Sequence, residues 1–246
     1  VLAAVDSLNK MIQDQLSGLD KNMITLCKFS FAPTDVPQWK RFQFPQVTYQ
    51  EFEQLQREMT NTEVVVYQIF GVNSSLKYGG KTIENVSVEA VSAGVEMLND
   101  IKIAKGRFFT DTEANTGSAV IVLGHNIAQQ LFGSEEPLDK EIRAFGRKMR
   151  VVGVLKRYGD MGDDTDEKAY TDANFVRTFI PTGPNGYPAA VTFKPKKGTD
   201  AIAYEETLRA RVRTMRGLKP EQIDNFFLNK VSSFTDMIDE TISMMN

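Results

Sequence analysis

Apolar residues recur at helical spacing at both ends of the chain. Near the start they occupy every third or fourth position: Leu2, Val5, Leu8, Ile12, Leu16 and Leu19. Near the end a second stripe of the same kind follows: Phe234, Ile238, Ile242 and Met245. Each stripe predicts one face of an amphipathic helix, and Ser233 and Asp236 resemble a capping box at the start of the second helix. We expect the two faces to pair in antiparallel fashion, with simple packing of each helix on the domain as the alternative.

After the first stripe the pattern changes to the two-residue period of a strand. Residues 23–31 are rich in strand formers that alternate between two sides, which predicts a core strand. Residues 32–46 contain three prolines, which exclude a continuous helix. We therefore expect an ordered loop there that packs Trp39 and Phe42 against the body of the domain.

Thr48 and Glu51 form a second capping box, which predicts a short helix. The apolar stripe of this helix follows at helical spacing: Phe52, Leu55 and Met59. Residues 64–70 then read as the next strand. Together, residues 23–70 form a strand, helix, strand unit, which needs a right-handed crossover if its strands are parallel.

Short strands dominate the middle of the chain. Tyr78-Gly79-Gly80-Lys81 places a two-glycine turn between arms at 72–78 and 82–90, the pattern of a tight hairpin. A buried strand over 118–123 follows, and residues 145–147 form a turn between two more strands. One short helix lies between these elements, and its apolar side consists of Ile127, Leu131 and Phe132.

Residues 157–170 combine glycine with a cluster of carboxylates and lack apolar periodicity, which predicts a mobile surface loop that separates two structural halves. The cluster consists of Asp160, Asp163, Asp164, Asp166 and Glu167. An EF-hand order of acidic residues is absent, so a solvated loop is favoured over a calcium site. Weak binding of a divalent ion or of a basic partner is the alternative.

The last third repeats the organisation of the first. The pattern predicts strands at 175–180, 189–193 and 225–231 and a helix over 202–212. The predicted fold class is therefore α+β. One subdomain is built from both chain ends, residues 1–70 and 172–246, and a β-rich subdomain, residues 71–171, is inserted between them.

Composition narrows the class of protein. Hydrophobic residues make up 41% of the chain and charged residues 25%, which is typical of globular domains. The 29 Lys and Arg nearly balance the 32 Asp and Glu, which argues against a nucleic-acid partner. The single Cys27 excludes an internal disulfide and leaves the compartment open. No stretch approaches the ~20 apolar residues that span a bilayer.

The sequence offers no recognisable reactive site. His125 is the only histidine, so a histidine-based zinc site or a Ser-His-Asp triad has no partners in any spaced motif. The glycines form neither a dinucleotide fingerprint nor a Walker loop. We therefore predict no catalytic, cofactor-binding or metal-binding residues and no cofactor.

One ordered series of motifs, between Gly106 and Val154, carries a family resemblance. The series consists of Gly106-Arg107-Phe108-Phe109-Thr110-Asp111-Thr112-Glu113, Ala119-Val120-Ile121-Val122-Leu123-Gly124, Ala128, Leu131-Phe132-Gly133, Pro137-Leu138 and Val151-Val152-Gly153-Val154. It resembles the periplasmic core domains of MacB-type ABC transporter permeases, in the FtsX/MacB-like permease family. Weaker similarity continues at Phe179-Ile180-Pro181. By itself, the Gly106-Arg107-Phe108-Phe109 element reads as a turn followed by two core phenylalanines, with Thr110 capping a helical turn.

The resemblance implies an architecture and a role. The subdomain made from both ends would be porter-like, the terminal helices would form a stalk, and transmembrane helices would flank the chain. It would thus be the periplasmic domain of an inner-membrane protein and transmit ATP-driven motion. The implied partners are a second copy of the permease, a periplasmic adaptor protein, exported cargo and the cytoplasmic ATPase domain or subunit.

Two alternatives belong to other classes. A free-standing secreted ligand-binding protein would need a deep apolar pocket between the two subdomains. A secreted hydrolase or metal-dependent enzyme would need a cleft with convergent polar groups and perturbed titrating residues. The absence of a nucleophile and base motif argues against the enzyme.

Overall fold

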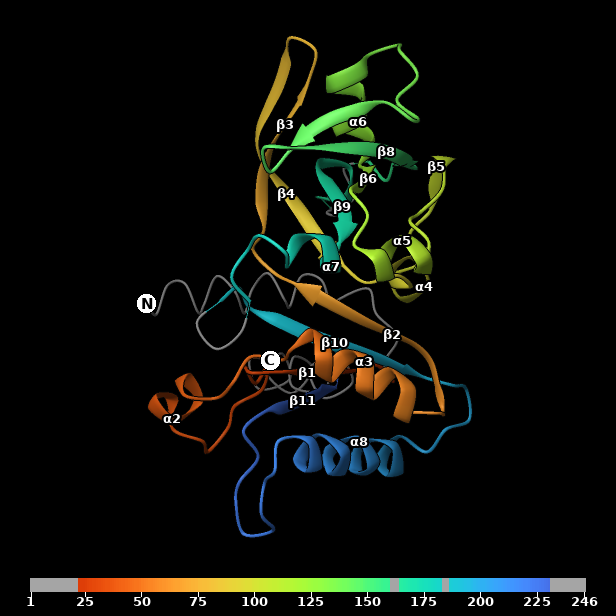
Figure 1. Cartoon of the computed structure of the whole chain (residues 1–246). Coiled ribbons are helices and arrows are strands. Elements are labelled where there is room, and N and C mark those ends of the chain that lie inside the picture. The colour runs from red at the N-terminus through yellow and green to blue at the C-terminus, as the bar shows by residue number, and fades with distance from the viewer. Residues whose placement is uncertain (1–21, 160–163, 183–185, 231–246) are drawn as a thin grey trace, which may run out of the picture. The chain divides into compact units, whose positions relative to one another are not determined.

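The computed structural model describes residues 22–159, 164–182 and 186–230, and the chain divides into two compact units. The first unit comprises residues 1–65 and 189–246, and the second comprises residues 66–188 (Figure 1). The mixed α+β class is confirmed. Both terminal amphipathic stripes lie outside the described residues.

The first unit contains the two strand, helix, strand units. Its strands follow the order β11-β1-β10-β2, with β10 between β1 and β2. The strands are β1 (Ile24–Cys27), β2 (Thr62–Ile69), β10 (Ala189–Pro195) and β11 (Phe227–Lys230). Along the chain, α3 (Tyr49–Glu58) joins β1 to β2, and α8 (Ala201–Met215) joins β10 to β11. This succession is that of a split β-α-β fold.

Helix α3 begins where the capping box predicts. The backbone N–H of Thr48 donates to Glu51 Oε2 at 2.8 Å, and the N–H of Glu51 donates to Thr48 Oγ1 at 3.2 Å. The predicted apolar stripe is buried: Phe52, Leu55 and Met59. Arg216, just after α8, donates from Nε to Glu51 Oε1 at 2.7 Å. The same carboxylate therefore caps α3 and ties it to the end of α8.

The predicted packing of Trp39 and Phe42 is wrong. The segment after Pro37 forms a short helix, α2 (Gln38–Phe42), with no buried residue. The Trp39 side chain is 64% exposed and that of Phe42 is 43% exposed. Phe44 fills the core instead, with its ring centroid 5.8 Å from that of Phe227. Proline spacing excludes a long helix, but it does not tell which aromatic residue turns inward.

The second unit is a ring of strands. Its order runs β4-β3-β7-β8-β6-β9, and a parallel pairing of β9 with β4 closes it. The strands are β3 (Asn73–Tyr78), β4 (Lys81–Val91), β6 (Val120–Leu123), β7 (Glu141–Ala144), β8 (Arg147–Leu155) and β9 (Lys168–Asp172). Strand β5 (Ile103–Gly106) adds to β8, and the end of β2 pairs with β4. Closure leaves few free strand edges.

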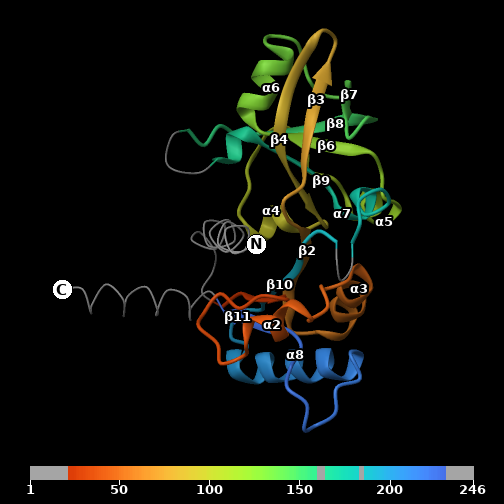
Figure 2. The same ribbon diagram turned by 90° about the vertical axis from the view of Figure 1, so that its left-hand side faces the viewer.

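Short helices cover this ring. They are α4 (Val95–Leu98), α5 (Asp111–Thr116), α6 (His125–Phe132) and α7 (Ala173–Val176). Helix α6 packs on the β3–β4 hairpin, where the ring centroids of Phe132 and Tyr78 are 4.3 Å apart (Figure 2). The predicted hairpin, the strand near 118–123 and the turn at 145–147 are confirmed.

Two predictions in this unit are wrong. Residues 175–180 do not form the predicted strand: α7 covers 173–176, because the Asp172 side chain caps a helix there, and turns follow it. Residues 164–170 form not a surface loop but a 3-10 turn, η1 (Asp164–Glu167), and the start of β9. The Asp166 carboxylate is buried, and Oδ1 accepts from the Tyr158 N–H at 3.0 Å.

The unit boundaries differ from the predicted 70/71 and 171/172. They lie at 65/66 and 188/189, because the last residues of β2 pair with β4 and the Phe70 N–H donates to the Pro188 carbonyl at 2.9 Å.

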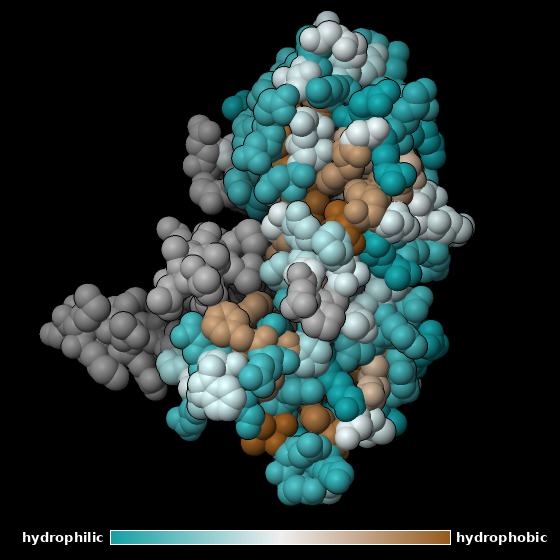
Figure 3. Space-filling view, turned by 60° about the vertical axis from the view of Figure 1, so that its left-hand side comes forward, coloured by the Kyte–Doolittle hydropathy of each residue, from teal (hydrophilic) through white to brown (hydrophobic). Residues whose placement is uncertain are grey.

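On the side shown in Figure 3, hydrophobic residues occupy small areas of a mostly hydrophilic surface. In the described ranges, no helix has both the length and the apolarity to cross a bilayer.

Candidate functional site

The motifs of the sequence resemblance meet in the second unit. Gly106 and Gly153 are register partners in the β5–β8 pair. A Cβ atom on Gly106 would lie 2.3 Å from the Val152 carbonyl oxygen, and one on Gly153 would lie 2.2 Å from the Arg107 carbonyl oxygen. Gly106 also has a φ of +70°, which side chains rarely adopt. Close backbone approach therefore requires both glycines.

The two phenylalanines that follow are part of the core, as expected. Phe108 and Phe109 are buried, with their ring centroids 4.6 Å apart. Phe108 also meets the Tyr170 ring edge-on at 5.8 Å. These contacts connect the motif to β9, so the phenylalanines hold the fold together instead of forming a binding element.

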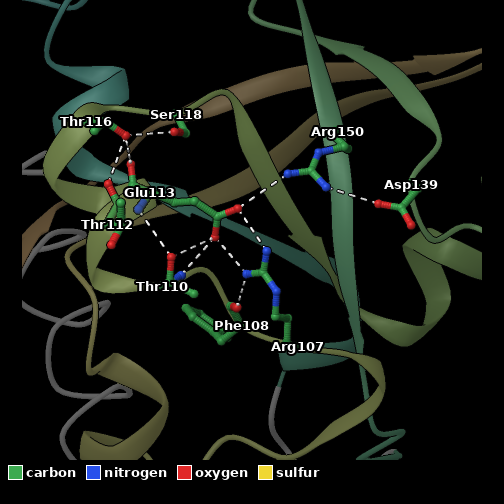
Figure 4. A network of polar contacts seen from close by, with 9 residues as sticks. All are labelled: Arg107, Phe108, Thr110, Thr112, Glu113, Thr116, Ser118, Asp139 and Arg150. Carbon is green, nitrogen blue, oxygen red and sulfur yellow. Dashed lines mark hydrogen bonds and ion pairs between the residues drawn. The ribbon is translucent and has the colours of Figure 1, made fainter.

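A polar network surrounds Glu113 next to this core (Figure 4). Arg107 donates to both carboxylate oxygens of Glu113, at 2.7 and 2.9 Å. Thr110 donates its backbone N–H to Glu113 Oε2 at 2.9 Å and completes a capping box that opens α5. Arg150 of β8 donates to Glu113 Oε1 at 3.4 Å and to Asp139 Oδ1 at 3.1 Å.

The electrostatics of this network suit a contact that holds structural elements together, and they do not suit a group that transfers protons. The hydrogen bonds from Arg107, followed by those from Thr110, lower the pKa of Glu113 to about 2. The carboxylate therefore stays charged near neutral pH and has little tendency to take up a proton. Because Glu113 lies on α5, Arg107 follows β5 and Arg150 lies on β8, the network joins three elements.

The other residues that the sequence singles out are not brought into one reactive site. His125 is the first residue of α6 and is half-buried. Cys27 is buried in the first unit, and its desolvation raises the pKa of the thiol to about 12. Among residues 22–159, 164–182 and 186–230, no group of three His, Cys, Asp or Glu side chains could hold a metal ion. Asp160 and Asp163 lie outside these ranges.

One titratable residue was not predicted. Asp172 ends β9, is fully buried and accepts the Phe175 N–H at Oδ2, 2.8 Å away. Its other oxygen, Oδ1, has no hydrogen-bond partner among the described residues. Desolvation raises the pKa of Asp172 to about 7, and the N–H groups of Phe175 and Asn174 oppose this shift. The signal in the sequence was an aspartate directly before a short helical segment.

Comparisons with known proteins place this arrangement among permease domains. The family model described as the MacB-like periplasmic core domain matches residues 1–211. The macrolide export ATP-binding/permease protein MacB of Neisseria gonorrhoeae is 25% identical over 179 residues, which cover 68% of this chain and 26% of that protein. The ABC transporter permease YknZ of Bacillus subtilis is 26% identical over 98 residues, which cover 40% of this chain and 25% of YknZ.

Solved structures agree on the fold. The periplasmic region of MacB from Actinobacillus actinomycetemcomitans matches with a TM-score of 0.70 at 17% identity, over 91% of this chain and 95% of that one. The extracellular domain of YknZ from Gram-positive bacteria matches with a TM-score of 0.63 at 19% identity, over 84% and 98%. The chain spans about a quarter of the length of the curated relatives it matches.

Proposed function

Because this chain belongs to the family of MacB-like periplasmic core domains, we propose that it transmits ATP-driven motion from the membrane to partners or cargo outside it. It is the periplasmic domain of a MacB/YknZ-like ABC transporter permease. The transmitted motion is a rigid-body displacement of the kind by which domains change position about an interface. The observation that carries the proposal is the family match over residues 1–211.

The contacts that the motif residues make support a mechanical role. The glycine pair at 106 and 153 allows two backbones to touch, and the Arg107–Glu113 pair is bidentate, with the Glu113 side chain 15% exposed and that of Arg107 48% exposed. A bidentate arginine–carboxylate pair adds fixed geometry as well as energy. Such contacts stiffen the second unit, and stiffness is what a domain needs to pass on a displacement.

The proposal assigns partners in the whole transporter. They are a second copy of the permease, a periplasmic adaptor protein, exported cargo and the ATPase domain or subunit on the other side of the membrane. It assigns no catalytic residue, metal or cofactor to the domain itself. Its relatives bear the names of export proteins and permeases, which supports a transport role. A porter-like subdomain with stalk helices is part of the same proposal.

Cysteine crosslinking of the terminal helices tests this arrangement. In the whole transporter, Val5→Cys and Ile242→Cys on the two apolar stripes should crosslink within one chain, because a disulfide needs Cα atoms within about 7 Å. The matched control pair, Ser7→Cys and Glu240→Cys, falls opposite the apolar stripes in the helical pattern of the sequence and should crosslink poorly. Cys27→Ser serves as the background.

The functional readout is ATP hydrolysis by the transporter in liposomes. A disulfide between the terminal helices should slow hydrolysis, and a reductant should restore it, because the ATPase cycle and the external domains are expected to move together. No crosslink in several neighbouring registers of the two stripes, with the domain still folded, would argue against the stalk. Unchanged hydrolysis in the crosslinked protein would argue against the transmission of motion.

A further inference from the structure

Three cationic residues lie side by side across the ring of strands in the second unit. Lys77 of β3 is opposite Arg143 of β7, and Arg143 is opposite Lys148 of β8. All three side chains are exposed. Figure 2 shows the three strands next to one another. We refer to Lys77, Arg143 and Lys148 as the basic row.

Taken by itself, the basic row lowers the stability of the sheet. Like charges directly opposite each other on neighbouring strands destabilise a sheet. The only ion pair that the described residues provide to the row joins Lys148 to Glu141 at 2.9 Å. Arg143 donates to the Gly146 carbonyl oxygen at 3.2 Å. Glu84 of β4 is an exposed carboxylate on the strand next to β3, but no ion pair joins it to the row.

Positive charge is also concentrated along the sequence around Arg143 and Lys148. Residues 141–150 hold four cationic side chains and one carboxylate, in a chain whose formal net charge is -3. The sequence neighbours of the row on these strands point inward and are apolar and buried: Leu76, Ile142 and Met149. The row therefore stands on the outer side of a packed, closed ring, which fixes the spacing of its charges.

We propose that the basic row is a docking surface for an acidic helix of an extracytoplasmic partner protein. Neighbouring strands lie about 4.8 Å apart, so the three cations span roughly 10 Å. Carboxylates at positions i, i+3 and i+7 share one face of a helix and span about 10.5 Å along its axis. The two charge patterns are opposite in sign and similar in length.

This inference rests on the proposed function only for the location of the partner outside the membrane. It adds the chemistry of that partner, which neither the fold nor the motifs specify. The crosslinking experiment tests the terminal helices, whereas peptide binding tests the basic row. Failure of one therefore leaves the other standing.

The experiment uses a fluorescent, alanine-rich helical peptide with three glutamates at i, i+3 and i+7, and measures binding to the full chain by anisotropy at low ionic strength. The variant K77Q/R143Q/K148Q should bind this peptide about tenfold more weakly, as expected for the loss of three exposed ion pairs. Added salt should weaken binding to the unmodified chain.

Two controls separate a docking surface from general attraction between charges. The variant K196Q/K197Q/K219Q removes three exposed lysines of the first unit and should bind like the unmodified chain. A second peptide with glutamates at every fifth position has the same charge spread around the helix and should bind more weakly. Equal losses in both variants, equal binding of both peptides, or no binding at all would overturn the proposal.

A stability measurement keeps the inference testable without the peptide. Removal of like charges that oppose each other should leave the melting temperature of K77Q/R143Q/K148Q equal to or above that of the unmodified chain. A clear decrease would mean that the row serves the fold, and would remove the reason to assign it a partner.

Discussion

Asp172 provides a direct test of the electrostatics inside the second unit. Its carboxylate is fully buried, and its folded-state pKa of about 7 lies well above the ordinary value of 3.8. The folded chain therefore holds this proton more tightly than the unfolded chain does. The resulting stabilisation is fully present below pH 4 and is lost as the pH rises through 7.

The magnitude follows from the pKa difference. About three pKa units at 1.36 kcal/mol each give an upper bound of about 4 kcal/mol between pH 4 and pH 8. Asp172→Asn cannot ionise, but its side-chain oxygen can still accept the Phe175 N–H. The variant loses a constant 1–3 kcal/mol, roughly, for an amide group left without a partner. Relative to the unmodified chain, Asp172→Asn should therefore gain stability as the pH rises from 4 to 8.

The choice of probe matters because the only tryptophan, Trp39, lies in the first unit. Hydrogen exchange of peptides from β9 and α7, measured between pH 4.5 and 8.5 and corrected for the intrinsic exchange rate, reports on the second unit directly. Asp200→Asn makes the same change at the exposed N-cap of α8 and serves as the control. If the protection of these peptides from exchange changed with pH in the same way in Asp172→Asn and in the unmodified chain, the reasoning would be refuted.

Three further predictions follow from single contacts. Cys27 should not react with iodoacetamide in the folded chain at pH 8, since a pKa of about 12 leaves roughly one thiol in ten thousand ionised; rapid labelling detected by mass spectrometry without denaturant would contradict this. Gly153→Ala should destabilise the chain by more than about 2 kcal/mol in urea unfolding, because its Cβ would lie 2.2 Å from the Arg107 carbonyl oxygen. The control Gly146→Ala, where the space is open, should cost only about 1 kcal/mol for its positive φ; equal losses would sink the steric argument. Glu113→Gln should remove about 1–2 kcal/mol at neutral pH, because water screens the half-exposed Arg107–Glu113 pair, and a folded-state pKa of about 2 gives stability that is present above pH 4.5 and lost as the pH falls toward 2. In thermal unfolding, an identical pH dependence of the unmodified chain and Glu113→Gln would contradict this prediction.

The features that the sequence predicts well are those whose physical cause is local. Thr48 and Glu51 form a capping box within four residues, so the start of α3 can be read directly from the chain. The hairpin at Gly79 and Gly80 depends on backbone freedom at two adjacent positions. In both cases the partner of each interaction lies within the window in which the pattern is visible.

The features that the sequence misses depend on partners that composition does not reveal. The acidic neighbours of Asp166 predict a solvated loop, yet the N–H groups of Tyr158 and Gly159 hold its carboxylate in a buried position. Asn229 donates to the Cys27 sulfur across a separation of 202 residues. An acidic run looks the same whether water or backbone N–H groups solvate its carboxylates, so periodicity could not distinguish the two.

Some residues are dictated by backbone packing and others are not, which explains why the family of this chain can be recognised from its sequence while its partner cannot. Gly106 and Gly153 touch through their backbones, so almost any other residue at either position would push two strands apart. Such positions are dictated by the fold itself. Arg143, in contrast, points outward from a strand whose neighbouring inward residue, Ile142, is already buried. The fold does not require a charge at that position and is weakened by like charges beside it. An outward residue that opposes the stability of its own sheet is therefore the better place to look for what this particular permease domain recognises.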